Sequence, residues 1–319
     1  MLDTKNLAVV PEDDGVSVGE YVKMFIDVYK SNSIKPSSLT RNYGILAKQI
    51  QPNIGDYKLS KITTNDIQKQ LINKLKDDGY SLSTIHKSYT LLNEAMNKAI
   101  QERKILFNAC VGVQMPSKNI IAPKQIEVLS DQEIELFVQA AKLQKIENSL
   151  AILLVLHTGL RCGELCALHW EDIDYENNII NVHRNIGISN VNGKRVTCIQ
   201  EGTKTRLMRT VPMNPKAKVI LKQIQKDSKG KLVINSKAEV PQVSTIGQQY
   251  DRILKYAGIE GKTGIHTLRH TFASQCFKKG IDVKYVSEIL GHSSVSFTLN
   301  TYVHLMPDQK QNVLDLLDF

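Results

Sequence analysis

The sequence lacks the features that mark several large classes of protein. Its longest uninterrupted apolar run, residues 150–156, is much shorter than the roughly 20 residues that a membrane-spanning helix needs. Residues 1–16 contain no basic patch followed by a long apolar segment, so nothing in them directs export. Glycine (18 residues) and proline (9 residues) are too few for a collagen-like or low-complexity chain. We therefore expect a cytoplasmic protein with no membrane partner.

Cysteine is scarce as well. The five cysteines are an odd number and are scattered along the chain: Cys110, Cys162, Cys166, Cys198 and Cys276. This distribution suits buried, reduced thiols better than a disulfide framework. Cys162 and Cys166 lie near His169 in sequence, but no second cluster of Cys and His completes a tetrahedral metal site. We expect no bound metal.

Positive charge, by contrast, is in excess. The chain of 319 residues has 41 Lys and Arg against 32 Asp and Glu, a net charge of +9, which favours a polyanionic partner. Residues 21–119 carry 15 basic and seven acidic side chains, and residues 181–216 carry seven basic and one acidic. Two separated basic segments are consistent with a protein that binds a DNA duplex from two sides. With 42% hydrophobic residues, the chain is also long enough for two domains, each with its own core.

The first third of the sequence has a helical pattern. Ser17 and Glu20 form a capping-box sequence, and apolar residues then recur at the spacing of one helix face. Further helices are predicted from Pro36, from Thr64 as N-cap to a stop at Gly79, and from about Ser83 past residue 100. These patterns predict a four-helix domain over residues 1–115. A basic, proline-bearing stretch, residues 116–125, is typical of an interdomain linker.

The second domain, residues 126–319, mixes helices with short strands. Ser130 and Glu133 predict a helix start, and residues 149–156 are apolar on all faces, as in a helix at the centre of a core. Short β-branched runs at 178–184, 195–200 and 207–213, separated by Asn192-Gly193 and Glu201-Gly202, predict a small antiparallel sheet. Helical patterns return at 215–226, 244–256, 266–279 and 283–290, and again near the C-terminus. The expected fold class is mainly α with a small antiparallel β-sheet.

Four short motifs and one tyrosine carry the residue types that phosphodiester chemistry requires. They are, in order, Thr-Gly-Leu-Arg-Cys-Gly-Glu at 158–164, Thr-Lys-Thr at 203–205, His-Thr-Leu-Arg at 266–269, Leu-Gly-His at 290–292, and Tyr302. His266 and Arg269 lie one helical turn apart and so share a face. His270 adds a third polar residue, but the glutamate that a zinc protease motif needs is absent. Each motif is weak alone, and together they form a coherent set.

Cleavage of a phosphodiester needs fixed positive charge, and the arginines of these motifs can supply it. A DNA phosphodiester is negatively charged, and its transition state places further charge on the non-bridging oxygens. Arg161 and Arg269 suit this task because a guanidinium stays protonated and its planar fork matches two phosphate oxygens. Gly159 can end the buried helix so that Arg161 starts the next one. Glu164, one turn beyond, can orient Arg161, or it can act only as a cap or an exposed ion pair; the sequence leaves these open.

The ordered motifs resemble those of the tyrosine recombinases, the phage-integrase family. The resemblance extends from the four-helix unit to the last helix, and Ser-Leu-Thr-Arg-Asn-Tyr at 38–43 is loosely similar to the family's core-binding domain. It implies a helical, SAM-like core-binding domain followed by an α+β catalytic domain. The phrase Thr-Gly-Leu-Arg-Cys-Gly-Glu-Leu and the basic hairpin region look most like integrases of conjugative transposons and phages.

This resemblance implies roles for six residues. Tyr302 would be the nucleophile that forms a 3′-phosphotyrosyl bond, and His266 the base that takes its proton. Lys204, at a hairpin tip, would protonate the departing 5′-oxygen. His292 would donate a hydrogen bond to a phosphate oxygen that Arg161 and Arg269 also contact. Neither metal nor ATP is expected, because fixed cations supply the charge and the covalent link conserves the ester's energy. Neighbouring basic residues are expected to contact DNA: Lys118, Lys124, Arg195, Arg206 and Arg209.

The same resemblance implies partners and leaves alternatives open. We expect double-stranded recombination sites, a homotetramer on DNA and an accessory directionality factor. The apolar residues 313–319 would fold onto their own domain or dock into a neighbouring protomer. An N-terminal arm-binding domain is not evident, so the protein either acts without arm sites or lacks that domain. A type IB topoisomerase and a non-catalytic DNA-binding regulator are the rival functions, and an intact nucleophile argues against the regulator.

Overall fold

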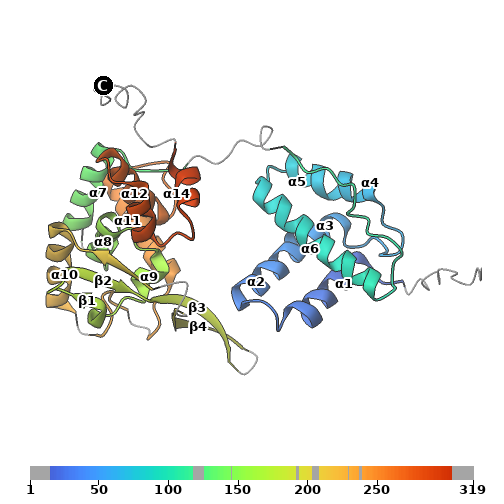
Figure 1. The fold of residues 1–319 in the computed structure, drawn as a ribbon, viewed down its shortest axis with the longest axis horizontal. Helices are drawn as coiled ribbons and strands as arrows, with labels where there is room; N and C mark the ends of the chain where they lie inside the picture. Colours follow the sequence, from blue (N-terminus) through green and yellow to red (C-terminus); the bar gives the residue numbers. More distant parts are fainter. Residues whose placement is uncertain are drawn as a thin grey trace, which may run out of the picture. The chain divides into compact units, whose positions relative to one another are not determined.

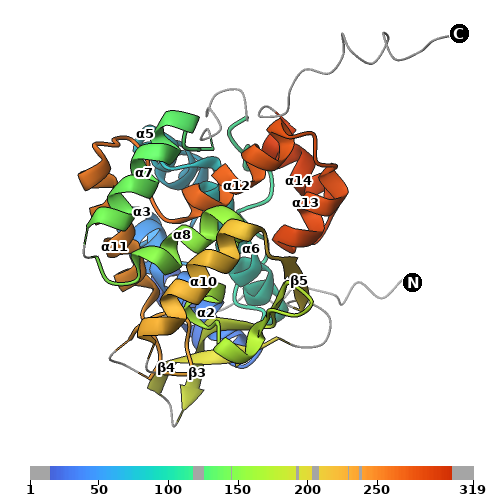
Figure 2. The same cartoon turned by 90° about the vertical axis from the view of Figure 1, so that its left-hand side faces the viewer.

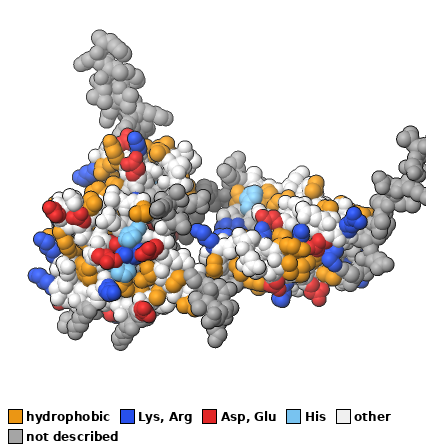
Figure 3. Space-filling view, turned by 60° about the horizontal axis from the view of Figure 1, so that its bottom comes forward, with side chains coloured by type: hydrophobic (Ala, Val, Ile, Leu, Met, Phe, Trp, Pro, Cys, Tyr) orange, Lys and Arg blue, Asp and Glu red, His pale blue; other side chains and the backbone are white. Residues whose placement is uncertain are grey.

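The computed structural model describes residues 15–117, 126–144, 146–191, 194–202, 208–228, 230–236 and 239–303. The chain falls into two compact units, Met1–Lys124 and Gln125–Phe319, drawn in Figure 1. Helices dominate both, and the second also has two small antiparallel sheets, so the expected fold class is confirmed. None of the helices formed by these residues has the length and apolar character needed to cross a membrane. Lys and Arg side chains lie at the surface of both units, interspersed with Asp and Glu (Figure 3).

The N-terminal unit consists of four continuous helical stretches, three of which contain π-helical turns. They are α1 (Val18–Phe25) with η1 (Ile26–Lys30); α2 (Pro36–Ile45) with η2 (Leu46–Ile50) and α3 (Gln51–Ile54); α4 (Thr64–Asp66) with η3 (Ile67–Asn73) and α5 (Lys74–Asp77); and α6 (Leu82–Gln101). The predicted capping box at Ser17 is present, because its side chain and that of Glu20 bond each other's backbone N–H. One start differs from prediction, because Thr63, not Thr64, caps α4. Helix α6 starts at Leu82 with Ser81 as its cap, close to the predicted start near Ser83.

Apolar faces from all four stretches form the core of this unit. Val18, Ile26, Ile50, Leu71 and Leu92 are fully buried. Such burial contributes roughly 1.5–3 kcal/mol for each large aliphatic side chain, which holds the four stretches together as one body.

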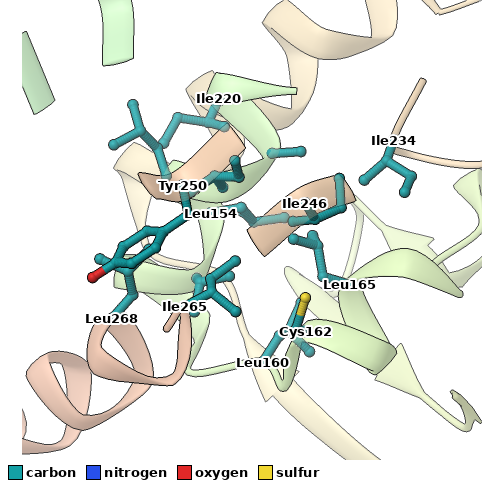
Figure 4. Packing of buried hydrophobic residues seen from close by; sticks show 14 of the residues in the cluster. Leu154, Leu160, Cys162, Leu165, Ile220, Ile234, Ile246, Tyr250, Ile265 and Leu268 are labelled. Atoms are coloured by element: carbon teal, nitrogen blue, oxygen red, sulfur yellow. The ribbon is translucent and has the colours of Figure 1, made fainter. Parts of the chain in front are cut away.

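The C-terminal unit is built around a fully apolar helix. Its helices are α7 (Asp131–Leu143), α8 (Ser149–Thr158), α9 (Cys162–Cys166), the 3₁₀ turn η4 (Trp170–Asp172), α10 (Pro215–Asp227), α11 (Val243–Ala257), α12 (His266–Lys278), α13 (Val283–Leu290) and α14 (Val295–Tyr302). Helix α8 contacts α7, α10, α11 and α12, and Figure 2 shows α7, α10 and α11 around it. Figure 4 shows Leu154 of α8 packed among side chains of these neighbours, including Ile220 and Tyr250. The apolar run predicted to be central is therefore central.

The strands lie on one side of this helical core. One sheet has the order β1 (Ile173–Asp174), β2 (Ile179–Val182), β5 (Arg209–Pro212), with Ile180 opposite Val211. The other is a hairpin of β3 (Arg184–Val191) and β4 (Lys194–Glu201), paired from one end to the other. The run predicted as one strand at 178–184 is thus divided at His183. Buried Asp172 anchors this break, because it accepts a bond from Arg184 (2.7 Å) and lies 2.6 Å from His183 Nε2.

The C-terminal residues beyond Val303 fall outside the described residues, and so does the predicted docking segment 313–319.

Candidate active site

Arg269, on helix α12, links the C-terminal ends of α8 and α13. This guanidinium is 4% exposed and donates from Nη1 to the Gly159 carbonyl and from Nη2 to the Leu290 carbonyl, both at 2.6 Å. Gly159 ends α8 and Leu290 ends α13. Burial, Arg161 and Arg209 lower the pKa of Arg269 to about 9, while Glu164 and Tyr302 act in the opposite direction. The group remains a cation at neutral pH.

Arg161 occupies the position that the sequence predicts, at the start of α9. Gly159 has a left-handed backbone (φ 64°), which turns the chain after α8 so that Arg161 becomes the N-cap of α9. Its Nη1 donates to Glu164 Oε1 (2.8 Å) and its Nη2 to the Gly291 carbonyl (2.9 Å). The side chain is 34% exposed. Because a guanidinium has five N–H groups, Arg161 can still donate to an incoming anion.

Glu164 is the centre of a buried ion network. Its side chain is 1% exposed, and Arg209 approaches it with both Nη atoms, at 2.9 and 2.7 Å. Burial alone would raise the pKa of Glu164, but Arg209 and Arg161 outweigh it and lower the pKa to about 2. Glu164 is therefore ionised. It accepts a hydrogen bond from the Arg161 guanidinium and, as a cap of α9, another from the Arg161 backbone N–H at 2.8 Å, so the orienting and the capping roles that the sequence left open both fit the structure.

Three arginines converge on the last carbonyls of α13. Arg209 Nε donates to Ile289 (2.6 Å), Arg269 to Leu290 (2.6 Å) and Arg161 to Gly291 (2.9 Å). A helix C-terminus carries partial negative charge, so it attracts cations. Gly291 has φ 65°, and a Cβ there would meet Arg209 Cδ at 2.9 Å, so the position requires glycine. This turn places the next residue, His292, beside the guanidinium cluster.

His292 and Tyr302 stack against each other beside this cluster. Their ring centroids are 6.3 Å apart with an interplanar angle of 12°. His292 Nδ1 lies 2.7 Å from the Thr298 hydroxyl, which orients the ring. Burial and the neighbouring arginines, Arg269 foremost, lower the pKa of His292 to about 4. The ring is therefore neutral at pH 7 and can donate a single N–H.

Tyr302 is enclosed at the end of α14. It is 1% exposed, its ring packs 5.7 Å from that of Phe277, and its hydroxyl lies 2.8 Å from His270 Nδ1. Burial raises the pKa of Tyr302 to about 12, although Arg269 and Arg161 act to lower it. The phenol is protonated and shielded from solvent in this conformation.

His270 has a role that the sequence does not predict. The sequence excludes it as a metal ligand, whereas the structure places it, and not His266, against the hydroxyl of Tyr302. His266 is exposed at the start of α12, with its ring centroid 6.5 Å from that of His270. The available signal was the spacing of four from His266, which puts both rings on one helix face.

The remaining sequence-predicted residues divide into two groups. Lys118, Lys124, Lys204 and Arg206 lie outside the described residues, as does the side chain of Arg195. Arg209, expected to contact DNA, has only 9% of its side chain exposed, and its donors are directed to Glu164 and Ile289. Its geometry is that of a positioning residue, because it holds Glu164 and the end of α13.

Comparisons with known proteins find matches for both units of the chain. Residues 127–309 match the phage integrase family, and residues 17–76 match the phage integrase N-terminal SAM-like domain. A XerC-like tyrosine recombinase of Caldanaerobacter subterraneus subsp. tengcongensis is 29% identical over 333 residues, which covers 95% of this chain and 83% of the relative.

Two solved structures share the fold. The Tn1549 transposon integrase in complex with circular intermediate DNA is 22% identical with a TM-score of 0.76, covering 94% of this chain and 99% of that one. A lambda integrase tetramer bound to a Holliday junction is 21% identical with a TM-score of 0.68, covering 93% and 79%.

Proposed function

This chain belongs to the phage integrase family, and on that premise we propose that it cleaves and rejoins DNA strands at specific sites to integrate or excise a mobile element. The resemblance inferred from the motifs is thus confirmed, and the chain is a tyrosine-type site-specific DNA recombinase. One observation carries the catalytic assignment. Arg161 and Arg269 meet at the end of α13, where His292 stacks on Tyr302.

The proposed reaction uses these groups to exchange one phosphoester for another. The Tyr302 oxygen bonds to phosphorus and the phosphorus–5′-oxygen bond breaks. The phenol loses its proton and the 5′-oxygen gains one. Arg161 and Arg269 stabilise charge on the non-bridging oxygens, and the neutral His292 donates a hydrogen bond to one of them. Lys204 is the proposed acid for the 5′-oxygen, and His266 the proposed base.

The reverse reaction with a partner's 5′-hydroxyl completes strand exchange. Because the 3′-phosphotyrosyl link keeps the energy of the broken ester, no ATP is needed. Tyr302, at 1% exposure, cannot meet a phosphorus in the conformation described. The proposal therefore includes a shift of α14 or of its neighbours before attack.

We propose double-stranded recombination sites as the substrate and a homotetramer as the working assembly, with an accessory factor setting direction. The net charge of +9 supports a polyanionic partner. The Tn1549 integrase is described with circular intermediate DNA, and the lambda integrase as a tetramer on a Holliday junction. Residues 1–115 would bind DNA as one domain and 126–319 as the catalytic domain, with Lys118, Lys124, Arg195 and Arg206 as phosphate contacts. The activity would take place in the cytoplasm, with its DNA.

Two plasmid assays test the proposed function against its rivals. A plasmid carrying two cognate sites should recombine in the presence of the purified protein, and Tyr302→Phe should abolish this. Tyr285→Phe is the matched control, because Tyr285 is 60% exposed on α13 and should leave recombination unchanged. Relaxation of a supercoiled plasmid without recombination would instead indicate a topoisomerase. DNA binding without either activity would indicate a regulator.

A further inference from the structure

Tyr302 is held in its enclosed position by a specific polar contact as well as by packing. The centroid of its ring is 5.6 Å from that of His270, 6.3 Å from that of His292 and 5.7 Å from that of Phe277. Aromatic contacts of this kind position the ring but do not satisfy the hydroxyl. The hydroxyl has His270 Nδ1 at 2.8 Å. A buried hydroxyl without such a partner is costly, because it loses its hydrogen bonds to water.

The protonation state of His270 suits it to accept this bond. Burial lowers its pKa to about 4, and the cations on the same helix, His266 when charged and Arg269, add to the effect. The ring is therefore neutral, with one nitrogen free to accept. With the ring proton on Nε2, Nδ1 accepts the phenolic O–H. A positively charged ring would be unable to do so.

We propose that His270 is a positioning residue that keeps Tyr302 protonated and enclosed by accepting its hydrogen bond, so that the nucleophile is released to a phosphate only when this bond breaks. The contact joins α12, which carries Arg269, to the last turn of α14. Enclosure and release of Tyr302 are therefore set within the same helix that supplies a phosphate-binding arginine. The proposal rests on the proposed function only in taking Tyr302 as the nucleophile.

Nitration by tetranitromethane measures this enclosure without DNA or turnover. The reagent modifies accessible, ionisable phenols, and peptide mass spectrometry reports each tyrosine separately. The chain supplies internal references: Tyr250 is fully buried by packing alone, since its hydroxyl has no hydrogen-bond partner among the described residues, and Tyr285 is 60% exposed. In the unaltered protein, Tyr285 should be nitrated quickly, whereas Tyr250 and Tyr302 should be protected.

Three variants isolate the hydrogen bond. His270→Leu removes the acceptor and should speed nitration of Tyr302 roughly tenfold, because the unpaired hydroxyl favours the open position. His270→Asn places an amide oxygen near the Nδ1 position and should restore protection. His157→Leu is the matched control: His157 is another half-buried histidine of this unit whose pKa burial lowers to about 4, and Tyr302 should stay protected.

The outcomes separate this proposal from the proposed function. Protection of Tyr302 in His270→Leu, or equal nitration in His270→Leu and His270→Asn, would overturn the role of the hydrogen bond. If Tyr250 also becomes nitrated in His270→Leu, the fold has loosened and His270→Gln decides instead. Its amide lies one bond farther from the backbone than the Nδ1 position, so nitration of Tyr302 supports the proposal and protection overturns it. Loss of recombination in Tyr302→Phe is scored independently.

Discussion

Glu164 and Arg209 form a bidentate ion pair inside the C-terminal unit, with oxygen–nitrogen distances of 2.9 and 2.7 Å. The pair positions Arg161, because Arg161 donates a hydrogen bond to the same carboxylate at 2.8 Å. Arg209 also ties the pair to α13 through the Ile289 carbonyl. The position of Arg161, the guanidinium proposed to bind a phosphate, therefore depends on a second arginine that need not touch DNA.

Removing Arg209 should destabilise the fold. Arg209→Met keeps most of the side-chain volume but leaves the Glu164 carboxylate short of two hydrogen bonds. Breaking a buried pair in this way costs about 3 kcal/mol of the free energy of unfolding, which urea denaturation at pH 7 would measure. Arg252→Met, at an exposed position of α11, should change it by less than about 0.5 kcal/mol. A similar small change for both variants would contradict the buried-pair account.

The same variant distinguishes a positioning role for Arg209 from a DNA contact. Each neutralised phosphate adds about 0.9 to the slope of log binding constant against log salt concentration on duplex DNA. Arg209→Met should lower that slope by no more than Arg161→Met does, because Arg209 has only 9% of its side chain exposed and acts through Arg161. A further fall of about 0.9 in the double variant relative to Arg161→Met, measured by fluorescence anisotropy, would restore Arg209 to the set of phosphate contacts.

Acid should weaken the fold through Glu164. Its pKa is lowered from 4.5 to about 2 in the folded protein, so the stabilisation is complete above pH 4.5 and is lost as the pH falls towards 2. The loss is about 3 kcal/mol. Urea unfolding between pH 6 and pH 2.5 should therefore show a steeper decline for the unaltered protein than for Glu164→Gln. Parallel pH profiles would mean that Glu164 is not paired as described.

Gly291 should be irreplaceable both because of its positive φ and because Arg209 lies against it. Gly291→Ala adds a Cβ that would meet Arg209 Cδ at 2.9 Å, whereas Gly258→Ala, at a similar φ of 67°, meets nothing within 4 Å. Both should lose about 1 kcal/mol to the left-handed backbone. Only Gly291→Ala should lose more and also slow covalent adduct formation on a half-site DNA. Equal stability loss in the two variants would rule out the close contact with Arg209.

Lysine should not replace Arg269. Its guanidinium bridges the Gly159 and Leu290 carbonyls, which lie on different helices, and a single ammonium cannot reproduce that planar fork. Adduct formation by Arg269→Lys should fall by about 10², with Arg252→Lys as the unaffected control. Near-normal rates for Arg269→Lys would show that charge alone is sufficient at this position.

Local patterns predicted much of the fold because local interactions decide those features. The capping pairs Ser17–Glu20 and Ser130–Glu133 start helices as expected, and the apolar residues 149–156 form the buried α8. The start of α4 was misplaced by one residue because Thr63 and Thr64 are both good caps. The division of the predicted strand at His183 depends on Asp172, a buried partner from another element.

The sequence likewise predicted some residues of the candidate site and missed others. The motif order pointed to Arg161, Arg269, His292 and Tyr302, and these do lie together. Arg209 appeared to be one of several basic residues on a hairpin, since only the tertiary fold brings it to Glu164 and α13. The role of His270 was missed for the same reason: its partner is 32 residues away, on a different helix.

The central claim is that the oxygen of Tyr302 becomes bonded to a DNA phosphorus, and mass spectrometry of the trapped adduct tests it most directly. The protein is incubated with a nicked half-site that prevents religation, digested with protease and nuclease, and searched for the peptide that carries a nucleotide. The account predicts the modification on the peptide of α14, at Tyr302, and its loss in Tyr302→Phe. A nucleotide on any other residue, or an adduct that persists in Tyr302→Phe, would contradict it.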